Sequence, residues 1–425
     1  MEELDIDGLF WPEEEPENQL AGRLRFDIQN GARLSLIGGF GGIEQFGTIP
    51  EPRCIHGVAG KRLLTLADCR QDGQSLEMPG IARERYSVPA VLSGGHLPVR
   101  MLDGFTSVSV KLHHLERWVN QTGTTVQYNS SEEGRSRSRF VLNFEPLETV
   151  AIEMGQFTLE LRFPWQFTPD LFDPTIRQFA AIAVQFDDPV SLEEAIVPCA
   201  AIQDLVTIGL DTPAVITQVS LTHSEVERKM TDGRILLDPI ELYARFRIGQ
   251  ISQDEGKPHT ATMLFTFDHI GGLDGVAKWL GVARTFSPVV GTLLAHQYLP
   301  SIHIENRFLN AVVALEALER IRAQKQQVIL KAALHHAVES AGTIGSDLVG
   351  CLDTWASEVQ KMRVLNVVHR GLHEDIDYPR MYELSESIYI LVIINLLQEC
   401  GVRQSMLSNI QGHDRYRRVA DGLAR

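Results

Sequence analysis

Hydrophobic and polar residues alternate along the first part of the chain, and the spacing of hydrophobic residues becomes helical after about residue 272. Leu24 and Phe26 alternate with polar residues, Asn30 and Gly31 follow, and a second alternating run begins at Leu34. An Asn-Gly pair between two such runs is a strong signal for a β-hairpin. Alternation returns, with breaks, at residues 157–163, 216–221, 242–248 and 263–267. These short strands predict a β-rich sandwich or barrel-like region, with a sub-domain boundary near residue 150 or 200.

Helical spacing marks the last part of the chain. Leu309, Val312 and Leu315 recur at the helical period, which predicts a helix over residues 302–321. Further helices are predicted over residues 328–341, 348–355, 359–371 and 382–397. Gly371 and Pro379 stand between the last two, as helix stop and start signals. The predicted fold class is therefore α+β multidomain, with a β-rich N-terminal region over residues 1–290 and an all-α bundle of four or five helices over residues 291–425.

Composition points to a folded protein of ordinary type. Hydrophobic residues make up 44% of the chain and charged residues 22%. The most apolar run, residues 388–397, is too short to span a bilayer, and the acidic N-terminus lacks the pattern of a signal peptide. We therefore expect a cytoplasmic protein with no membrane partner.

The net charge of −16 is concentrated in the first 300 residues. Residues 301–425 hold 14 basic and 15 acidic side chains, which leaves about −15 for the rest of the chain. An acidic protein is a poor general binder of polyanions, so any contact with nucleic acid must be local. The nearly neutral C-terminal part is the better host for such a contact.

The five cysteines are scattered and odd in number, which is typical of reduced thiols. Cys54, His56 and Cys69 resemble part of a metal-ligand set, but they lack a CxxC pair and a clear fourth ligand. Ordinary packing is the simpler interpretation, and we expect no metal and no cofactor. Two further motifs are better explained without phosphate binding: GGFGG, residues 38–42, as a turn or bulge, and GRSRSR, residues 134–139, as a solvated loop.

The segment RVLNVVH, residues 363–369, places three polar groups on one face of a predicted helix. At about 100° per residue, Asn366 and His369 fall within about 120° of Arg363, and aliphatic residues fill the other arc. Arg370, seven residues after Arg363, lies almost above it. Of the 14 histidines, His369 alone has an arginine five to seven residues upstream. A plain polar helix face, or a histidine satisfied within the core, explains the same pattern.

Three segments resemble one known family. RVLNVVH matches the R-x4-6-H motif of HEPN domains, helical bundles that often act as ribonucleases. ENRFLNAVVALEALER, residues 305–320, resembles the first core helix of ApeA-like HEPN proteins, and LFWPEEEPENQLAGRLRF, residues 9–26, resembles the start of the ApeA N-terminal domain. The chain departs from many HEPN nucleases in one respect. Val364 follows the arginine where Asn, Asp or His is common, and the polar residue comes later, at Asn366.

The resemblance implies metal-independent cleavage of RNA in bacterial anti-phage defence. The 2′-OH of the substrate attacks the adjacent phosphate, so RNA and not DNA is cut. In this scheme His369 acts as general acid or base, and Arg363 binds the phosphate as negative charge develops. Asn366 orients one of these groups, and Arg370 either contacts the substrate or lies at the surface. Glu316 has three open roles: pairing with Arg363, holding His369, or solvation.

HEPN domains typically pair face to face, so the family implies a homodimer or higher homo-oligomer whose two motifs line one RNA cleft. The β-rich region would control the nuclease and respond to an unknown phage-derived trigger. The RNA cut, tRNA or another class, stays open. The arginine-rich tail, residues 413–425, suits RNA contact, although a disordered or helix-capping tail is the more common explanation. Two other functions also remain: a non-catalytic HEPN dimerisation or scaffold module, and a ligand-binding β protein with a helical tail.

Overall fold

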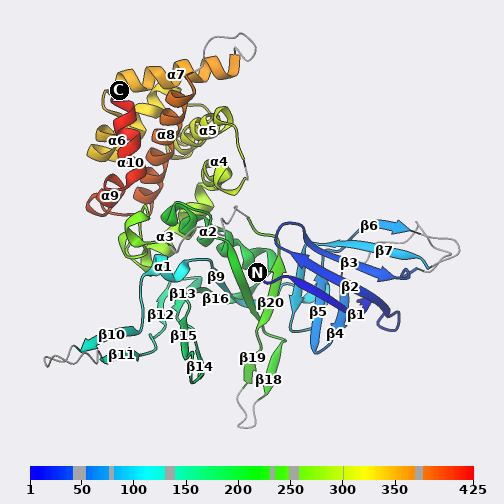
Figure 1. Ribbon diagram of the computed structural model, residues 1–425. Coiled ribbons are helices and arrows are strands. Elements are labelled where there is room, and N and C mark those ends of the chain that lie inside the picture. Colours follow the sequence, from blue (N-terminus) through cyan, green and yellow to red (C-terminus); the bar gives the residue numbers. More distant parts are fainter. Residues whose placement is uncertain are drawn as a thin grey trace.

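One large antiparallel sheet forms most of the N-terminal region (Figure 1). The computed structural model describes residues 1–41, 54–75, 81–129, 139–229, 235–247, 258–299, 301–368 and 377–425, and it describes the backbone alone at Asn129, Arg139, Lys229, Ile235 and residues 366–368. The strands of the large sheet are, in spatial order, β12 (Val150–Glu153), β13 (Phe157–Arg162), β16 (Ala181–Val190), β9 (Phe105–Leu112), β17 (Ile216–His223), β20 (Ile240–Ala244), β8 (Ala90–Ser93), β5 (Arg62–Ala67), β4 (Cys54–Ala59), β1 (Leu4–Pro12), β2 (Leu20–Asp27), β3 (Gly31–Ile37), β7 (Arg83–Val88) and β6 (Arg70–Ser75). Three hairpins stand apart from it: β10 (Thr124–Asn129) with β11 (Arg139–Phe144), β14 (Trp165–Thr168) with β15 (Thr175–Gln178), and β18 (Glu227–Lys229) with β19 (Ile235–Leu237).

The hairpin predicted around Asn30 and Gly31 is present between β2 and β3. Asp27 Oδ1 accepts hydrogen bonds from the backbone N–H groups of Gln29, at 3.0 Å, and Asn30, at 2.6 Å. Gly31 has φ 77°, a left-handed conformation that costs glycine little. The alternating apolar residues of both strands are buried, as the period-2 pattern predicts.

The first half of the sheet curls strongly. The rings of Phe26 on β2 and Tyr243 on β20 lie 5.5 Å apart, although several strands separate β2 from β20 in the sheet order. Only a curled sheet brings these strands together, and the space that it encloses is filled by an apolar core built from β1 to β8. This curling agrees with the barrel-like character expected of the region.

The helices are α1 (Leu115–Val119), α2 (Leu192–Leu210), α3 (Leu273–Thr285), α4 (Ser287–Tyr298), α5 (Ile304–Ala323), α6 (Leu330–Val349), α7 (Leu352–Val368), α8 (Tyr378–Glu399), α9 (Gln404–Gln411) and α10 (Asp414–Leu423). Helices α5, α6, α7 and α10 surround α8, which is buried along most of its length (Figure 1). The α+β fold class is confirmed. Among the described residues, no helix combines the length and apolar character that crossing a membrane requires.

The sheet and the bundle share one apolar core. A single cluster of buried residues runs from β9, β13, β16 and β17 through α2 and α3 to α5, α6 and α8. The indole Nε1 of Trp279 on α3 donates a hydrogen bond of 2.8 Å to the carbonyl oxygen of Ala201 on α2. The helical part therefore packs against the β-rich region through α2 and α3.

Candidate functional site

Arg363 lies near the C-terminal end of α7 and forms a two-pronged ion pair with Glu316 of α5. Its Nη1 is 2.8 Å from Glu316 Oε1, and its Nη2 is 3.1 Å from Glu316 Oε2. The Arg363 side chain is 37% exposed, so the pair lies at the surface of the bundle. Of the three roles left open for Glu316, the structure contains the pairing with Arg363.

The structure does not describe the side chains of the other residues on the predicted polar face. Asn366 lies in the last turn of α7, where the structure describes its backbone alone. His369 and Arg370 lie outside the described residues, as does Gly371. The described residues begin again at Asp377, whose carboxylate accepts the backbone N–H of Arg380 at 2.9 Å and caps α8. The arrangement of Arg363, Asn366, His369 and Arg370 around one phosphate therefore stays a prediction.

A buried ionic cluster joins the C-terminal tail to the β-rich region. Arg415 of α10 pairs with Asp211, the C-cap residue of α2, and its Nε is 2.5 Å from Glu386 Oε2 on α8. Glu386 also pairs with Arg307 of α5, and the Arg415 guanidinium lies 4.2 Å from the ring centroid of Tyr389. Burial raises the pKa of Glu386, but the charges of Arg415 and Arg307 outweigh it and hold that pKa below its usual value.

This cluster bears on whether the arginines of the tail, residues 413–425, contact RNA. Arg415 is 7% exposed and cannot contact RNA without leaving its two carboxylate partners. Helix α10 is folded and packed, while Arg417 and Arg418 on it remain exposed. Sequence reasoning missed Glu386, although a carboxylate inside the apolar stretch that precedes residue 397 signals a buried partner.

A cavity of about 890 Å³ lies between the sheet and helices α2, α3 and α4. Its wall is mainly apolar, with Phe157 and Phe186 from β13 and β16, and it includes the ion pair of Asp204 and Arg247 at 2.7 Å. Burial raises the pKa of Asp204, although Arg247 opposes this effect. The volume and lining are typical of a small-molecule site.

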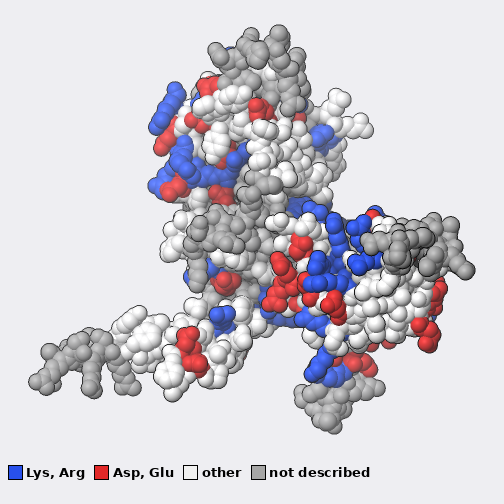
Figure 2. Space-filling model, turned by 45° about the vertical axis from the view of Figure 1, so that its right-hand side comes forward, with Lys and Arg blue, Asp and Glu red and all other residues white. Residues whose placement is uncertain are grey.

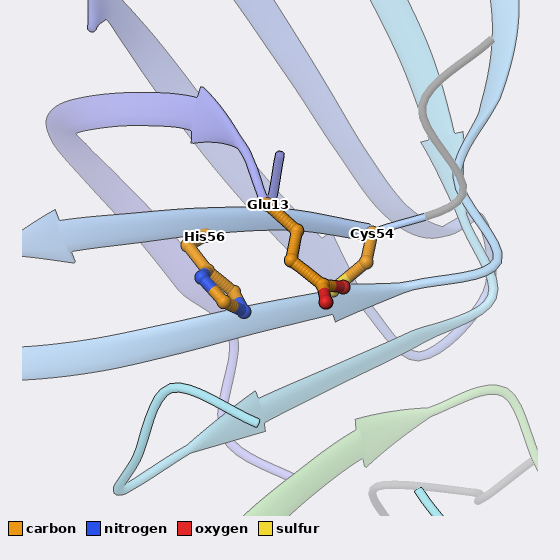
Figure 3. Close-up of side chains that lie close together, drawn as sticks. All are labelled: Glu13, Cys54 and His56. Carbon is orange, nitrogen blue, oxygen red and sulfur yellow. The ribbon is translucent and has the colours of Figure 1, made fainter. Parts of the chain in front are cut away.

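Three potential metal ligands meet where β1 ends beside β4: Glu13, Cys54 and His56 (Figure 3). Cys69, which the sequence grouped with Cys54 and His56, lies outside this cluster. Its thiol donates to the carbonyl oxygen of Leu66 at 3.4 Å, inside the apolar core. The sequence pattern thus predicted two of the three residues, Cys54 and His56, and the pairing of β1 with β4 brings Glu13 beside them.

Exposed arginines gather on the outer face of β2, β3 and β7, beside the acidic residues of β1 (Figure 2). Arg23 and Arg25 pair with Asp5 at 2.5 and 3.3 Å, and hydrogen bonding by Arg23 lowers the pKa of Asp5 to about 2. Arg33 and Arg85 have no carboxylate within 4.0 Å among the described residues. The β-rich region is therefore negatively charged as a whole but carries a local group of arginines on this face.

Comparison with known families identifies the β-rich region. Residues 5–279 match the model of the family described as ApeA N-terminal domain 1, which covers well over half of the 425 residues. The chain belongs to this family. The match runs from β1 to the first half of α3, so it includes the sheet, α2 and much of the cavity wall. ApeA membership associates the chain with anti-phage defence. No curated protein and no solved structure gives a significant match.

Proposed function

We propose that the chain is a metal-independent endoribonuclease of the HEPN type, which cleaves RNA, tRNA included, in anti-phage defence. The observation that carries the proposal is Arg363: it is partly exposed, oriented by Glu316, and placed near the end of a bundle helix. That bundle adjoins an ApeA N-terminal domain, and the histidine of the R-x4-6-H motif follows Arg363 by six positions.

The pairing of Arg363 leaves part of its guanidinium free for a phosphate. Glu316 accepts one hydrogen bond from each Nη atom, so two of the five N–H donors are used. The edge formed by Nε and the adjacent Nη keeps two parallel donors, and among the described residues none accepts from that Nε. A planar two-donor edge matches two phosphate oxygens. Glu316 would thus hold Arg363 in place while its other edge binds the scissile phosphate.

His369 is the proton-transfer group in this mechanism. It takes the proton of the attacking 2′-OH or gives one to the leaving 5′-oxygen, because imidazole titrates near neutral pH. Arg363 stabilises the negative charge that develops on the phosphorane. Asn366 orients the histidine or the phosphate, and Arg370 adds contact to the RNA backbone. The products would carry 2′,3′-cyclic phosphate ends.

One histidine per chain supplies one of the two proton transfers, so we propose a homodimer that brings two motifs to one cleft. Val313 and Val364 are 43% and 50% exposed, and they neighbour Glu316 and Arg363 in sequence. Exposed apolar side chains beside the pair suit contact with a second copy. Val364→Glu should then yield a folded monomer that has lost cleavage. An unchanged dimer would place the interface elsewhere.

Control by the β-rich region is proposed to pass through α2. This helix forms part of the cavity wall, and its C-cap residue, Asp211, pairs with Arg415 of the tail. A phage-derived trigger that shifts α2 would act on the bundle through this contact. Because the two regions share one core, truncation at residue 290 would expose apolar surface. Asp211→Asn on the full chain is the cleaner test, and an unaltered response to infection would argue against this route.

The proposed activity is tested in bacteria challenged with phage. Arg363→Ala and His369→Ala should lose protection at normal protein levels. His336→Ala is a matched control, since His336 lies in the same bundle but pairs with Glu319, whereas Arg363 pairs with Glu316. Full protection by both motif variants would instead support the non-catalytic alternative.

A further inference from the structure

Strand pairing brings three ligand atoms together on one face of the sheet. In the antiparallel pair of β1 and β4, Trp11 is opposite His56, and the backbone N–H of Glu13 donates to the carbonyl oxygen of Cys54 at 3.2 Å. Cys54 and His56 are two residues apart on a strand, so their side chains point to the same side. One atom from each of Glu13, Cys54 and His56 lies within 4.8 Å of the other two. Figure 3 shows the three side chains converging.

A fourth possible ligand atom, a backbone oxygen, lies close to two of these three side chains. The carbonyl oxygen of Leu97 is 3.2 Å from His56 Nε2 and 3.7 Å from Cys54 Sγ. With bonds of about 2.0 Å to nitrogen or oxygen and about 2.3 Å to sulfur, neighbouring ligands of a tetrahedral zinc ion lie roughly 3.3–3.7 Å apart. The two separations from the Leu97 oxygen are therefore close to the edges of such a tetrahedron, and the three side-chain ligand atoms lie within 4.8 Å of one another.

We propose that Glu13, Cys54 and His56 bind one structural zinc ion, with the Leu97 carbonyl oxygen or a water as fourth ligand. Mixed sulfur, nitrogen and oxygen ligands in four-fold coordination favour Zn²⁺ over the hard cations Mg²⁺ and Ca²⁺. The ion would fasten the end of β1 to β4 and to the segment that follows β8. This site lies in the β-rich region and does not depend on the proposed nuclease activity.

The surroundings favour the metal-binding form of two of the three ligands, His56 and Glu13. Burial lowers the pKa of His56, which favours the neutral imidazole, and Glu13 Oε2 accepts the backbone N–H of Val99 at 2.8 Å, which orients its carboxylate. The His56 ring stacks on His96, with 4.9 Å between centroids. Burial, followed by the charge of Glu13, raises the pKa of Cys54 to about 12, so zinc must displace the thiol proton.

Cobalt titration of the full-length, chelator-treated protein tests the site. Co²⁺ bound to one thiolate in four-fold geometry gives a thiolate-to-cobalt charge-transfer band and strong visible absorption, both of which zinc abolishes. We expect one equivalent of Co²⁺ per chain and a zinc-dependent rise in the melting temperature. Cys69→Ser is the matched control, because Cys69 is 4% exposed and Cys54 is 3% exposed. It should bind cobalt as the wild type does.

Cys54→Ser should lose the charge-transfer band, and His56→Gln and Glu13→Gln should weaken cobalt binding by more than the roughly 10–100-fold effect typical of an outer hydrogen-bond partner. The last two variants keep the test decisive if Cys54→Ser does not fold. Wild-type protein without stoichiometric uptake would overturn the proposal, as would a band that survives in Cys54→Ser or a loss confined to Cys69→Ser.

Discussion

Replacing Glu386 by Gln tests the buried ionic cluster most sharply. The cluster holds the carboxylates of Asp211 and Glu386 and the guanidinium groups of Arg307 and Arg415, so its formal charge is zero. The substitution Glu386→Gln would keep the shape of the side chain but leave two guanidinium groups against one carboxylate. The Glu386 side chain is 0% exposed and that of Arg415 is 9% exposed, so water cannot compensate the excess charge.

The expected loss of stability follows from this imbalance. Removing one member of a buried ion pair costs about 3–5 kcal/mol, because an uncompensated charge remains in the interior. Arg415→Met alone should cost a similar amount, since it leaves an excess negative charge. The double variant leaves Asp211 and Arg307, which restores neutrality. Its cost should be smaller than the sum of the two single effects by about 1–3 kcal/mol.

Hydrogen exchange of the α8 amides, followed by mass spectrometry, measures the local opening free energy in all four proteins of this cycle. Asp274→Asn is the control, because it breaks the exposed pair of Asp274 with Lys278 and should leave exchange in α8 unchanged. Single variants that cost less than about 1 kcal/mol, or effects that add within about 0.5 kcal/mol, would refute the reasoning.

Three further outcomes are expected. Glu316→Gln should lower kcat for RNA cleavage, because Arg363 loses a carboxylate that orients it through two hydrogen bonds. RNA affinity should hold or improve, because the site gains net positive charge; equal loss of kcat and affinity would contradict a positioning role. Ser191→Ala removes the capping box with Glu194 and should destabilise α2 by about 1 kcal/mol, measured by hydrogen exchange in its first turn. Burial, with the charges of Arg307 and Arg415, lowers the pKa of His296 to about 4. Because the unfolded chain then binds a proton that the folded protein excludes, the free energy of unfolding should fall by about 3 kcal/mol as pH drops from 6.5 towards 4. Urea unfolding at several pH values measures this loss, and His296→Gln should remove it.

Local patterns predicted several elements closely. The β2–β3 hairpin follows from its turn residues, and the predicted end of a helix at residue 341 coincides with Gly342, where α6 departs from helical geometry at φ 64°. The segments predicted at 348–355 and 359–371 instead belong largely to one helix, α7, because nothing between them interrupts the helical period. Helix α2 was missed, since its apolar residues are buried on nearly all sides and give little periodicity.

The candidate sites depend on contacts that sequence spacing cannot reveal. Arg363 on α7 and Glu316 on α5 are 47 residues apart, so the sequence left their pairing as one of three options for Glu316, and the fold decides between them. Glu13 joins Cys54 and His56 through strand register, which a sequence leaves open. Asp211 and Arg415 are separated by 204 residues. The residue types indicate that these charged and ligand-type side chains need partners, but only the fold determines which partner each one meets.

Cleavage of RNA in excess EDTA tests the central claim most directly. Purified wild type, His369→Ala and the control His336→Ala would be incubated with total RNA and tRNA, with and without lysate from phage-infected cells, and fragment ends would be mapped. The account predicts cleavage by wild type and His336→Ala that leaves 2′,3′-cyclic phosphate ends, and none by His369→Ala. Equal cleavage by wild type and His369→Ala, or no cleavage by wild type even with infected lysate, would contradict it.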